Sequence, residues 1–301
     1  MHLKLAVERF IEAKEAGFRS RATITKYADI LKSFVQRVGE DKKLEDVGPE
    51  DIRNFLSEKR KQGQKPASVD THYRTLRTFW NWAVPEYGLG ANPMDRVEKP
   101  RIPKRLPPRL SREDARRLLR AAGTSRNPSR DRAILLLLFD CGVRAGELIG
   151  LRVKDVDFES RTVRVIGKDQ EERVVPISDT TARALKEYLN GRSNSLDDSL
   201  LLSTRTRGPM TVSGLRQILK RLARVAGLTR SVYPHLLRHT FAYMWVKEGG
   251  NLEKLRRIMG HSRLETTGIY ASALQEDVEE EHRRLRPAEK IAEETVQPSL
   301  W

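Results

Sequence analysis

The first part of the chain carries apolar residues at three- and four-residue steps, the spacing that places them on one face of an α-helix. Leu5 to Ala16 and Thr23 to Val38 follow this pattern. Pro49, a favoured first-turn residue, opens a third such segment, and Pro66 to Ala83 forms a fourth. The pattern therefore predicts a domain of four helices.

The rest of the chain is also mainly helical, but its apolar period changes to two over one stretch. Ser111, followed by two acids, predicts a capped helix start, and Arg130 to Phe139 predicts a helix buried on most sides. Alternation predicts three short strands at Asp155 to Phe158, Thr162 to Ile166 and Arg173 to Ile177. The predicted fold class is mainly α with a small antiparallel β-sheet in the C-terminal domain. The further helices are expected at Ala145 to Leu151, Thr180 to Leu189, Val212 to Ala226, Pro234 to Lys247, Leu252 to Met259 and Arg263 to Tyr270.

A basic, proline-rich segment separates the two helical regions. Lys99 to Leu110 reads KPRIPKRLPPRL, with four prolines, five basic residues and no acid. Prolines favour extended backbone and remove amide donors, so this segment is expected to be a linker that lies against a polyanion. The predicted organisation is a helical domain over 1–98, the linker over 99–110, a second domain over 111–275 and a tail over 276–301.

Composition bounds the partner and the compartment. The 301 residues carry a formal net charge of +16 and a pI of about 10.1, which favours a polyanionic partner such as nucleic acid. The single cysteine, Cys141, excludes an internal disulfide and a cysteine-based zinc site. Met1 to Arg9 lacks a long apolar stretch, and Ile134 to Phe139 is too short to span a bilayer, so a cytosolic protein without a membrane partner is expected.

Two short segments place cations where a phosphate could bind. His235 and Arg238 stand three apart after Pro234, so both are expected on one face of a helix start, where unpaired amides favour anions. Arg144 follows the end of a buried helix, where a charged side chain is unusual unless it has a polar or charged partner. Glu147, one turn later, could orient Arg144 or a histidine. The guanidinium fork can hold two phosphate oxygens together.

Three further residues complete a candidate reaction centre. Lys168 is predicted at a hairpin tip, from which it could donate a proton to a leaving oxygen. His261 is predicted between two helix ends, with Gly260 ending one helix and a capping box opening the next. Tyr270 is the candidate nucleophile, because neighbouring cations stabilise a phenolate. Each residue alone has an ordinary structural explanation, so their combination carries the hypothesis.

The order and surroundings of these six residues resemble the tyrosine recombinases, the group of Xer-type recombinases and phage integrases. Asp140-Cys-Gly-Val-Arg144-Ala-Gly-Glu147-Leu is similar to the motif around the first arginine of that family. His235-Leu-Leu-Arg238-His-Thr is similar to its His-x-x-Arg box, and Leu-Arg-Arg-Ile-Met-Gly-His261-Ser to its second histidine motif. The resemblance covers about residues 105 to 275, with Tyr270 at the usual distance.

The resemblance implies a two-domain DNA clamp that cleaves and rejoins duplex DNA at a specific site through a 3′-phosphotyrosyl intermediate, without a metal, ATP or another cofactor. Arg144 and Arg238 would hold the scissile phosphate, which Tyr270 would attack. Lys168 would protonate the 5′-oxygen and His261 would hydrogen-bond the phosphate. His235 would exchange a proton near the nucleophile, with Glu147 in support. A homotetramer on DNA, with or without a second recombinase, is also implied.

Other basic residues are expected to contact the DNA backbone, although each could equally lie on a solvated face. The segment 276–301 starts with acidic residues and is therefore not expected to bind DNA. The family resemblance implies that it docks on a neighbouring protomer. The candidate DNA contacts are Arg74, Arg77, Lys104, Arg105, Arg216, Lys220, Arg221 and Arg224.

Four functions are consistent with this reading. The leading one is Xer-like resolution of chromosome or plasmid dimers, and the first alternative is integration of a phage or mobile element. A type IB topoisomerase shares the phosphotyrosine chemistry without needing a particular site. A DNA-binding relative without catalysis would use the fold alone, which the intact set of six residues argues against.

Overall fold

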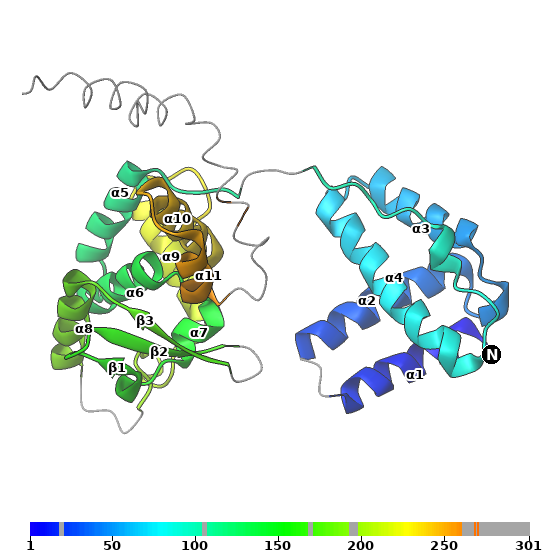
Figure 1. Ribbon diagram of the computed structural model, residues 1–301, viewed down its shortest axis with the longest axis horizontal. Coiled ribbons are helices and arrows are strands. Elements are labelled where there is room, and N and C mark those ends of the chain that lie inside the picture. Colours follow the sequence, from blue (N-terminus) through cyan, green and yellow to red (C-terminus); the bar gives the residue numbers. More distant parts are fainter. Residues whose placement is uncertain are drawn as a thin grey trace, which may run out of the picture. The chain divides into compact units, whose positions relative to one another are not determined.

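The computed structural model describes residues 1–17, 21–103, 107–167, 171–192, 198–260, 268 and 270. The chain divides into two compact units, Met1–Arg105 and Leu106–Trp301, each with its own hydrophobic core (Figure 1). The predicted fold class is confirmed, because helices dominate both units and the second contains one small antiparallel sheet. Among the described residues, no helix is both long enough and apolar enough to cross a lipid bilayer.

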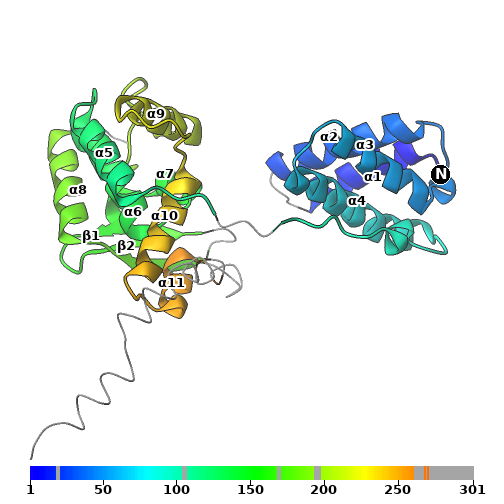
Figure 2. The same cartoon turned by 90° about the horizontal axis from the view of Figure 1, so that it is seen from above.

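The first unit is built from the four predicted helices, which pack side by side (Figure 2). They are α1 (Leu3–Ala16), α2 (Arg21–Val38), α3 (Pro49–Lys61) and α4 (Pro66–Tyr87), with short 3₁₀ turns η1 (Leu44–Asp46) and η2 (Pro93–Arg96) between and after them. Aromatic rings fill the centre: Phe10 meets Phe79 edge-on with centroids 5.5 Å apart, and Trp80 is fully buried.

One boundary in this unit differs from the prediction. The helix expected to end at Ala83 continues through Pro85 to Tyr87. A proline lacks one amide donor, so in the last turn it costs the helix a single hydrogen bond. The helix can therefore continue past Pro85. Gly88 ends the helix in the left-handed conformation, with φ of 62°, and its amide returns to the Val84 carbonyl.

The second unit contains seven helices among its described residues. They are α5 (Arg112–Gly123), α6 (Pro128–Cys141), α7 (Ala145–Gly150), α8 (Asp179–Gly191), α9 (Val212–Val225), α10 (Pro234–Lys247) and α11 (Leu252–Met259). The predicted cap is present, because the Ser111 hydroxyl accepts a hydrogen bond from the Asp114 amide at 3.0 Å. Of the expected helix over residues 263–270, only Gly268 and Tyr270 are described, and both are helical.

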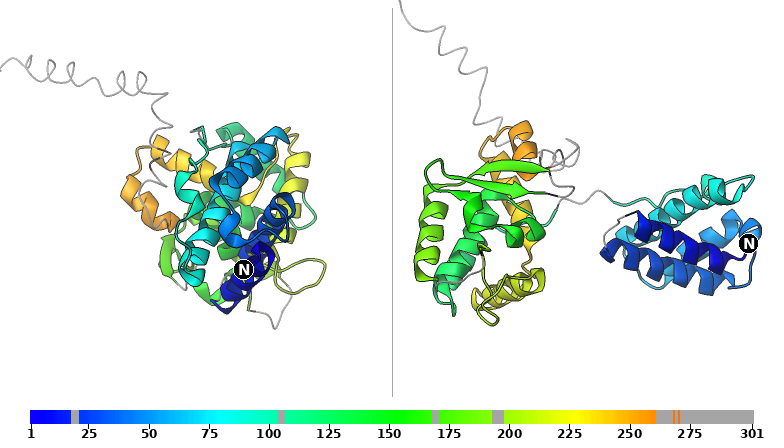
Figure 3. Two further views of the ribbon diagram at one scale, coloured as in Figure 1. Left: turned by 90° about the vertical axis from the view of Figure 1, so that its right-hand side faces the viewer. Right: turned by 90° about the horizontal axis from the view of Figure 1, so that it is seen from below.

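The sheet consists of β1 (Val156–Asp157), β2 (Thr162–Ile166) and β3 (Glu172–Pro176), antiparallel and in that order. Its inward valines join the core that α6 and α8 also enter, and Figure 3 shows the strands lying against the helices. The first strand is shorter than predicted. Residues Val153–Asp155 form a 3₁₀ turn (η3) instead, held by the Asp155 carboxylate, which accepts from the Arg152 amide at 2.9 Å.

Candidate active site

The end of α6 and the start of α7 position Arg144. Gly142 ends α6 with φ of 56°, and an added Cβ would lie 2.3 Å from the Phe241 ring, so both the turn and the packing require glycine. Arg144 is the N-cap of α7, and its amide donates to Glu147 Oε2 at 2.8 Å. Its guanidinium donates to Glu147 Oε1 at 2.7 Å and to the Gly260 carbonyl at 2.9 Å. With 39% of the side chain exposed, Arg144 can exchange a partner for an anion from solvent.

Glu147 is a buried carboxylate shared by two arginines. Arg173, on β3, donates to both of its oxygens, at 3.1 and 2.7 Å, and also to the Ile258 carbonyl at 2.8 Å. Burial would raise the pKa of Glu147, but the hydrogen bonds from Arg173 and Arg144 outweigh it and lower the pKa to about 2. Glu147 is therefore ionised at neutral pH, and among its described contacts it orients arginines and no histidine.

Arg173 was not among the sequence candidates. It lies on a strand predicted from alternation, and only the fold brings it next to Glu147, which precedes it by 26 positions. An arginine at an alternating position with only 14% of its side chain exposed could have been flagged, since charged residues are seldom buried without a partner.

Arg238 is buried in α10, with 2% exposure. Its two terminal nitrogens donate to the carbonyls of Gly142, at 2.5 Å, and Met259, at 2.7 Å, so it joins the ends of α6 and α11. Burial, followed by repulsion from Arg144, lowers the pKa of Arg238 to about 10, at which it remains charged at neutral pH. The structure thus brings Arg144 and Arg238 to the same set of helix ends.

His235 and Tyr270 are both placed by the structure beside this cationic group. His235 is exposed in the first turn of α10, and its pKa is lowered by partial desolvation and then by Arg238, Arg144 and Arg216. Tyr270 is 3% exposed, within a small cluster with residues of α10 and α11 such as Phe241 and Met259. Burial raises the pKa of Tyr270, and the nearby charge of Arg238 opposes that shift.

His239 is a second residue that the sequence reasoning missed. Its Nδ1 lies 2.6 Å from the Tyr270 hydroxyl, and its ring stacks on that of His235 with centroids 6.0 Å apart. Burial, then His235 and Arg238, lower the pKa of His239 to about 4. His239 could have been predicted from the sequence, because it stands four positions after His235 and therefore lies on the same face of the helix.

The other candidates fall into three groups. Lys168, His261, Lys104 and Arg105, with the tail 276–301, lie outside the described residues. Arg74 and Arg77, on α4, contact their own helix: Arg74 pairs with the buried Asp70 at 2.7 Å, and Arg77 donates to the Tyr73 hydroxyl at 3.0 Å. On α9, Arg216, Lys220 and Arg224 are exposed.

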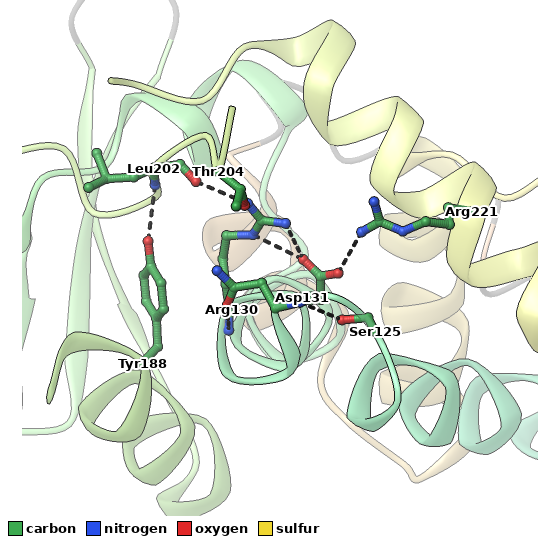
Figure 4. Close-up of polar contacts among 8 residues, drawn as sticks. Ser125, Arg130, Asp131, Tyr188, Leu202, Thr204 and Arg221 are labelled. Atoms are coloured by element: carbon green, nitrogen blue, oxygen red, sulfur yellow. Dashed lines mark hydrogen bonds and ion pairs between the residues drawn. The ribbon is translucent and has the colours of Figure 1, made fainter. Parts of the chain in front are cut away.

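Arg221 differs from the other basic residues of α9. Its guanidinium turns inward and donates to Asp131 at 2.9 Å, while Arg130 occupies the other oxygen of that carboxylate (Figure 4). Arg130 also donates to the Leu202 carbonyl and the Thr204 hydroxyl. Arg221 therefore forms an ion pair with a buried carboxylate inside the unit, although 35% of its side chain remains exposed.

The arrangement suits an anion and a neutral nucleophile. Arg144 and Arg173 bind the Glu147 carboxylate, and Arg238 lies close enough to feel its charge, so three cations surround one anion and the site has an excess of positive charge. Cys141 also carries a side chain that could act as a nucleophile. Burial raises the pKa of its thiol, however, so the reactive thiolate is unfavourable there. Within the described part of the chain, no group of acidic, histidine and cysteine side chains is arranged to hold a metal ion.

Comparison with known proteins places this geometry among DNA-processing enzymes. Residues 108–277 match the phage integrase family, and residues 7–87 match the phage integrase N-terminal SAM-like domain. The tyrosine recombinase XerC of Bacillus subtilis is 32% identical over 266 residues, covering 85% of this chain and 88% of that protein. The tyrosine recombinase XerD of Listeria innocua is 29% identical, covering 89% and 93%.

Solved structures agree on the fold. The XerA recombinase is 28% identical with a TM-score of 0.55 and covers 94% of this chain and 98% of its own. The Tn1549 transposon integrase, solved in complex with transposon right end DNA, is 20% identical with a TM-score of 0.79, covering 95% of this chain and 100% of its own. At that identity the likeness shows a shared fold.

Proposed function

Because the chain belongs to the phage integrase family and is a tyrosine recombinase, a DNA strand-transferase, we propose that it carries out site-specific recombination of duplex DNA through a 3′-phosphotyrosyl intermediate. The single observation that supports this most is the meeting of Arg144, Arg238 and the Tyr270 side chain at the ends of α6, α10 and α11. The same residues stand in the motifs that the family resemblance rests on.

In the proposed reaction, Arg144 and Arg238 exchange backbone carbonyls for the oxygens of the scissile phosphate. Both guanidinium groups donate to such carbonyls, which hold their N–H donors in a fixed orientation. Preorganised donors stabilise the charge that develops on a pentacoordinate phosphorus. Glu147 would keep Arg144 and Arg173 in place, because its carboxylate is bound by both.

The remaining roles follow the family pattern. Tyr270 would attack the phosphate and release a 5′-hydroxyl, with Lys168 as proton donor and His261 as a phosphate ligand. His235, exposed at the start of α10, would accept or donate a proton near the nucleophile. The covalent bond conserves the energy of the phosphodiester, so the proposed reaction uses neither ATP nor a metal.

On the scale of the assembly, we propose that the two units close around a duplex and that four protomers form the recombining synapse. A second recombinase could supply two of the four protomers. The names of the relatives favour Xer-like resolution of chromosome or plasmid dimers over integration, since the curated relatives named above are XerC and XerD. The proposed compartment is the cytoplasm, where replicon DNA would be accessible.

A nicked suicide substrate tests the chemistry. On such DNA the short strand beyond the nick diffuses away after cleavage, and the enzyme stays trapped on the 3′-phosphate. Wild-type protein is expected to become covalently attached, whereas Tyr270→Phe, which lacks the attacking oxygen, is not. Equal trapping by both proteins, separated on a denaturing gel, would refute the assignment of Tyr270.

The same assay separates the alternatives. A site-specific recombinase traps on its own recombination site and not on a scrambled duplex, whereas a type IB topoisomerase traps on both. A DNA-binding relative without catalysis traps on neither, although it still shifts the duplex in a native gel. Recombination between two directly repeated sites on one plasmid then distinguishes dimer resolution from integration into a second replicon.

A further inference from the structure

Among the described contacts of Tyr270, the histidine is His239 and not His235, which the family pattern places near the nucleophile. Among the described residues, its hydroxyl is hydrogen-bonded to His239 Nδ1 at 2.6 Å, with ring centroids 5.9 Å apart. The ring of His235 stacks on the other histidine, His239, with centroids 6.0 Å apart. His239 is therefore the basic group in contact with the atom that would attack the phosphate.

We propose that His239 is a further catalytic residue, which accepts the phenolic proton of Tyr270 as this side chain attacks the DNA phosphate. The proposal rests on the proposed function and assigns a proton acceptor within it. A general base must lie within hydrogen-bond reach of the proton that it removes, about 2.6 to 3.2 Å between heavy atoms, and His239 Nδ1, 2.6 Å from the Tyr270 hydroxyl, meets this condition.

Other bases near Tyr270 are less suitable. Glu147 has its carboxylate bound by Arg144 and Arg173, and those hydrogen bonds lower its pKa to about 2, so it has little affinity for a proton. His235 is exposed on the outer side of the histidine pair, where the phosphate can reach it. The two histidines can thus serve different oxygens, with His239 on the nucleophile.

The charges around His239 keep it in the form that accepts a proton. The titratable and charged groups that face it among the described residues are Tyr270, His235 and Arg238. Burial and the last two lower its pKa to about 4, so its ring is neutral at neutral pH and Nδ1 can present a lone pair. A phosphate bound to Arg238 offsets the cation and raises the pKa of His239 toward the operating range.

The proposed step balances as follows. The Oη–H bond of Tyr270 breaks and its proton moves to His239 Nδ1. An oxygen electron pair forms the Oη–P bond while the bond from phosphorus to the 5′-oxygen breaks. That oxygen leaves with the bonding pair and takes a proton from the acid on its side, for which Lys168 is the candidate. In religation the proton returns from His239 to the tyrosine.

The test measures single-turnover cleavage of the suicide substrate by full-length His239→Asn at saturating DNA. Asparagine keeps an acceptor oxygen near the place of Nδ1 but cannot take up a proton. Loss of general-base catalysis is expected to slow cleavage by about 100- to 10,000-fold. The rate of the variant should then rise about tenfold per pH unit, because attack depends on the small fraction of Tyr270 that is already ionised at a pH below the pKa of its phenol, which burial raises.

A second substrate locates the proton transfer. Sulfur in place of the bridging 5′-oxygen leaves without protonation, so it rescues enzymes that lack the acid but not those that lack the base. His239→Asn is therefore expected to remain slow on the phosphorothiolate. Rescue by this substrate would place His239 on the leaving group and overturn the proposal. A wild-type rate and pH profile would show that the hydrogen bond only positions the tyrosine, which also overturns it.

Two controls separate these outcomes from misfolding and from failure of the proposed function. His72→Asn changes a half-buried histidine of α4, also with a lowered pKa, and is expected to leave cleavage and its pH profile unchanged. Wild-type DNA affinity and thermal midpoint for His239→Asn exclude misfolding. Tyr270→Phe is assayed in parallel: if it still forms the covalent complex, the proposed function fails, whatever His239 does.

Discussion

The protonation states of single residues at the candidate site depend on the competition between burial, which disfavours the charged form, and nearby charges. Arg238 and Tyr270 are almost fully buried, and the pKa of each stays well above neutral pH, so both keep their protons: the guanidinium remains a cation and the phenol remains neutral. For Glu147, burial favours the neutral acid, but the hydrogen bonds from Arg173 and Arg144 are stronger and keep the carboxylate ionised. The cations of the proposed phosphate site are therefore held in place by groups of the protein itself.

Glu147 makes a pH-dependent contribution to stability. Its pKa is about 2 in the folded chain against an ordinary value of 4.5, so its contribution is fully present above about pH 4.5 and is lost as the pH falls through about 2. Glu147→Gln is expected to cost about 3 to 5 kcal/mol at neutral pH, because Arg173 loses a buried partner. The cost should shrink in acid. Urea unfolding at several pH values measures both curves, and parallel curves would contradict this account.

At the scale of elements, one buried carboxylate connects two helices of the second unit. Asp131, in α6, is fully buried and binds Arg130 beside it and Arg221 of α9 (Figure 4). The ion pair explains why α9 carries an inward arginine in a basic face, and it fixes the rotation of that helix. Arg216, Lys220 and Arg224 are consequently exposed together.

Removing this carboxylate tests the connection. Asp131→Asn leaves the buried Arg130 without its counter-charge and is expected to lower the free energy of unfolding by about 3 to 5 kcal/mol. Chemical denaturation followed by circular dichroism measures the change. Asp179→Asn is the matched control, because its ion pair with Arg161 lies in solvent and should be dispensable. Equal midpoints for wild type and Asp131→Asn would rule out a structural role for the pair.

For the whole molecule, the net charge of +16 favours a DNA affinity that falls steeply as salt is added. Each phosphate contact releases condensed counterions, so the logarithm of the affinity falls with the logarithm of the salt concentration by about 0.9 per contact. The exposed basic face of α9 is the part of the described structure where such contacts are proposed.

Substitutions on α9 test this proposal. Arg216→Gln and Arg224→Gln are each expected to reduce the salt slope by about one, whereas Arg183→Gln, exposed on α8, should leave it unchanged. Fluorescence anisotropy with a labelled duplex over a range of salt concentrations gives the slopes. Unaltered slopes for both α9 variants would remove this helix from the DNA interface.

Much of the architecture follows from local patterns. The limits of β2, α10 and α11 agree with the prediction, because apolar periodicity and residues such as Pro234 and Gly260 act within one or two turns of the chain. The boundary at Pro85 was less predictable, since whether a helix continues past a proline depends on its surroundings. Family motifs also identified Arg144, Arg238 and Tyr270 as members of one candidate site, although not how they meet.

Only the tertiary structure decided which side chains are partners. Arg173 reaches Glu147 across 26 positions, Tyr270 reaches His239 across 31, and Arg221 turns to Asp131 across 90. Such pairs depend on how helices and strands pack, which local periodicity does not encode. The positions of the helices and strands and the type of chemistry could therefore be predicted from the sequence. The direction of each guanidinium, the burial of the phenol and the histidine in contact with it arise from packing, because burial and proximity are properties of the folded chain.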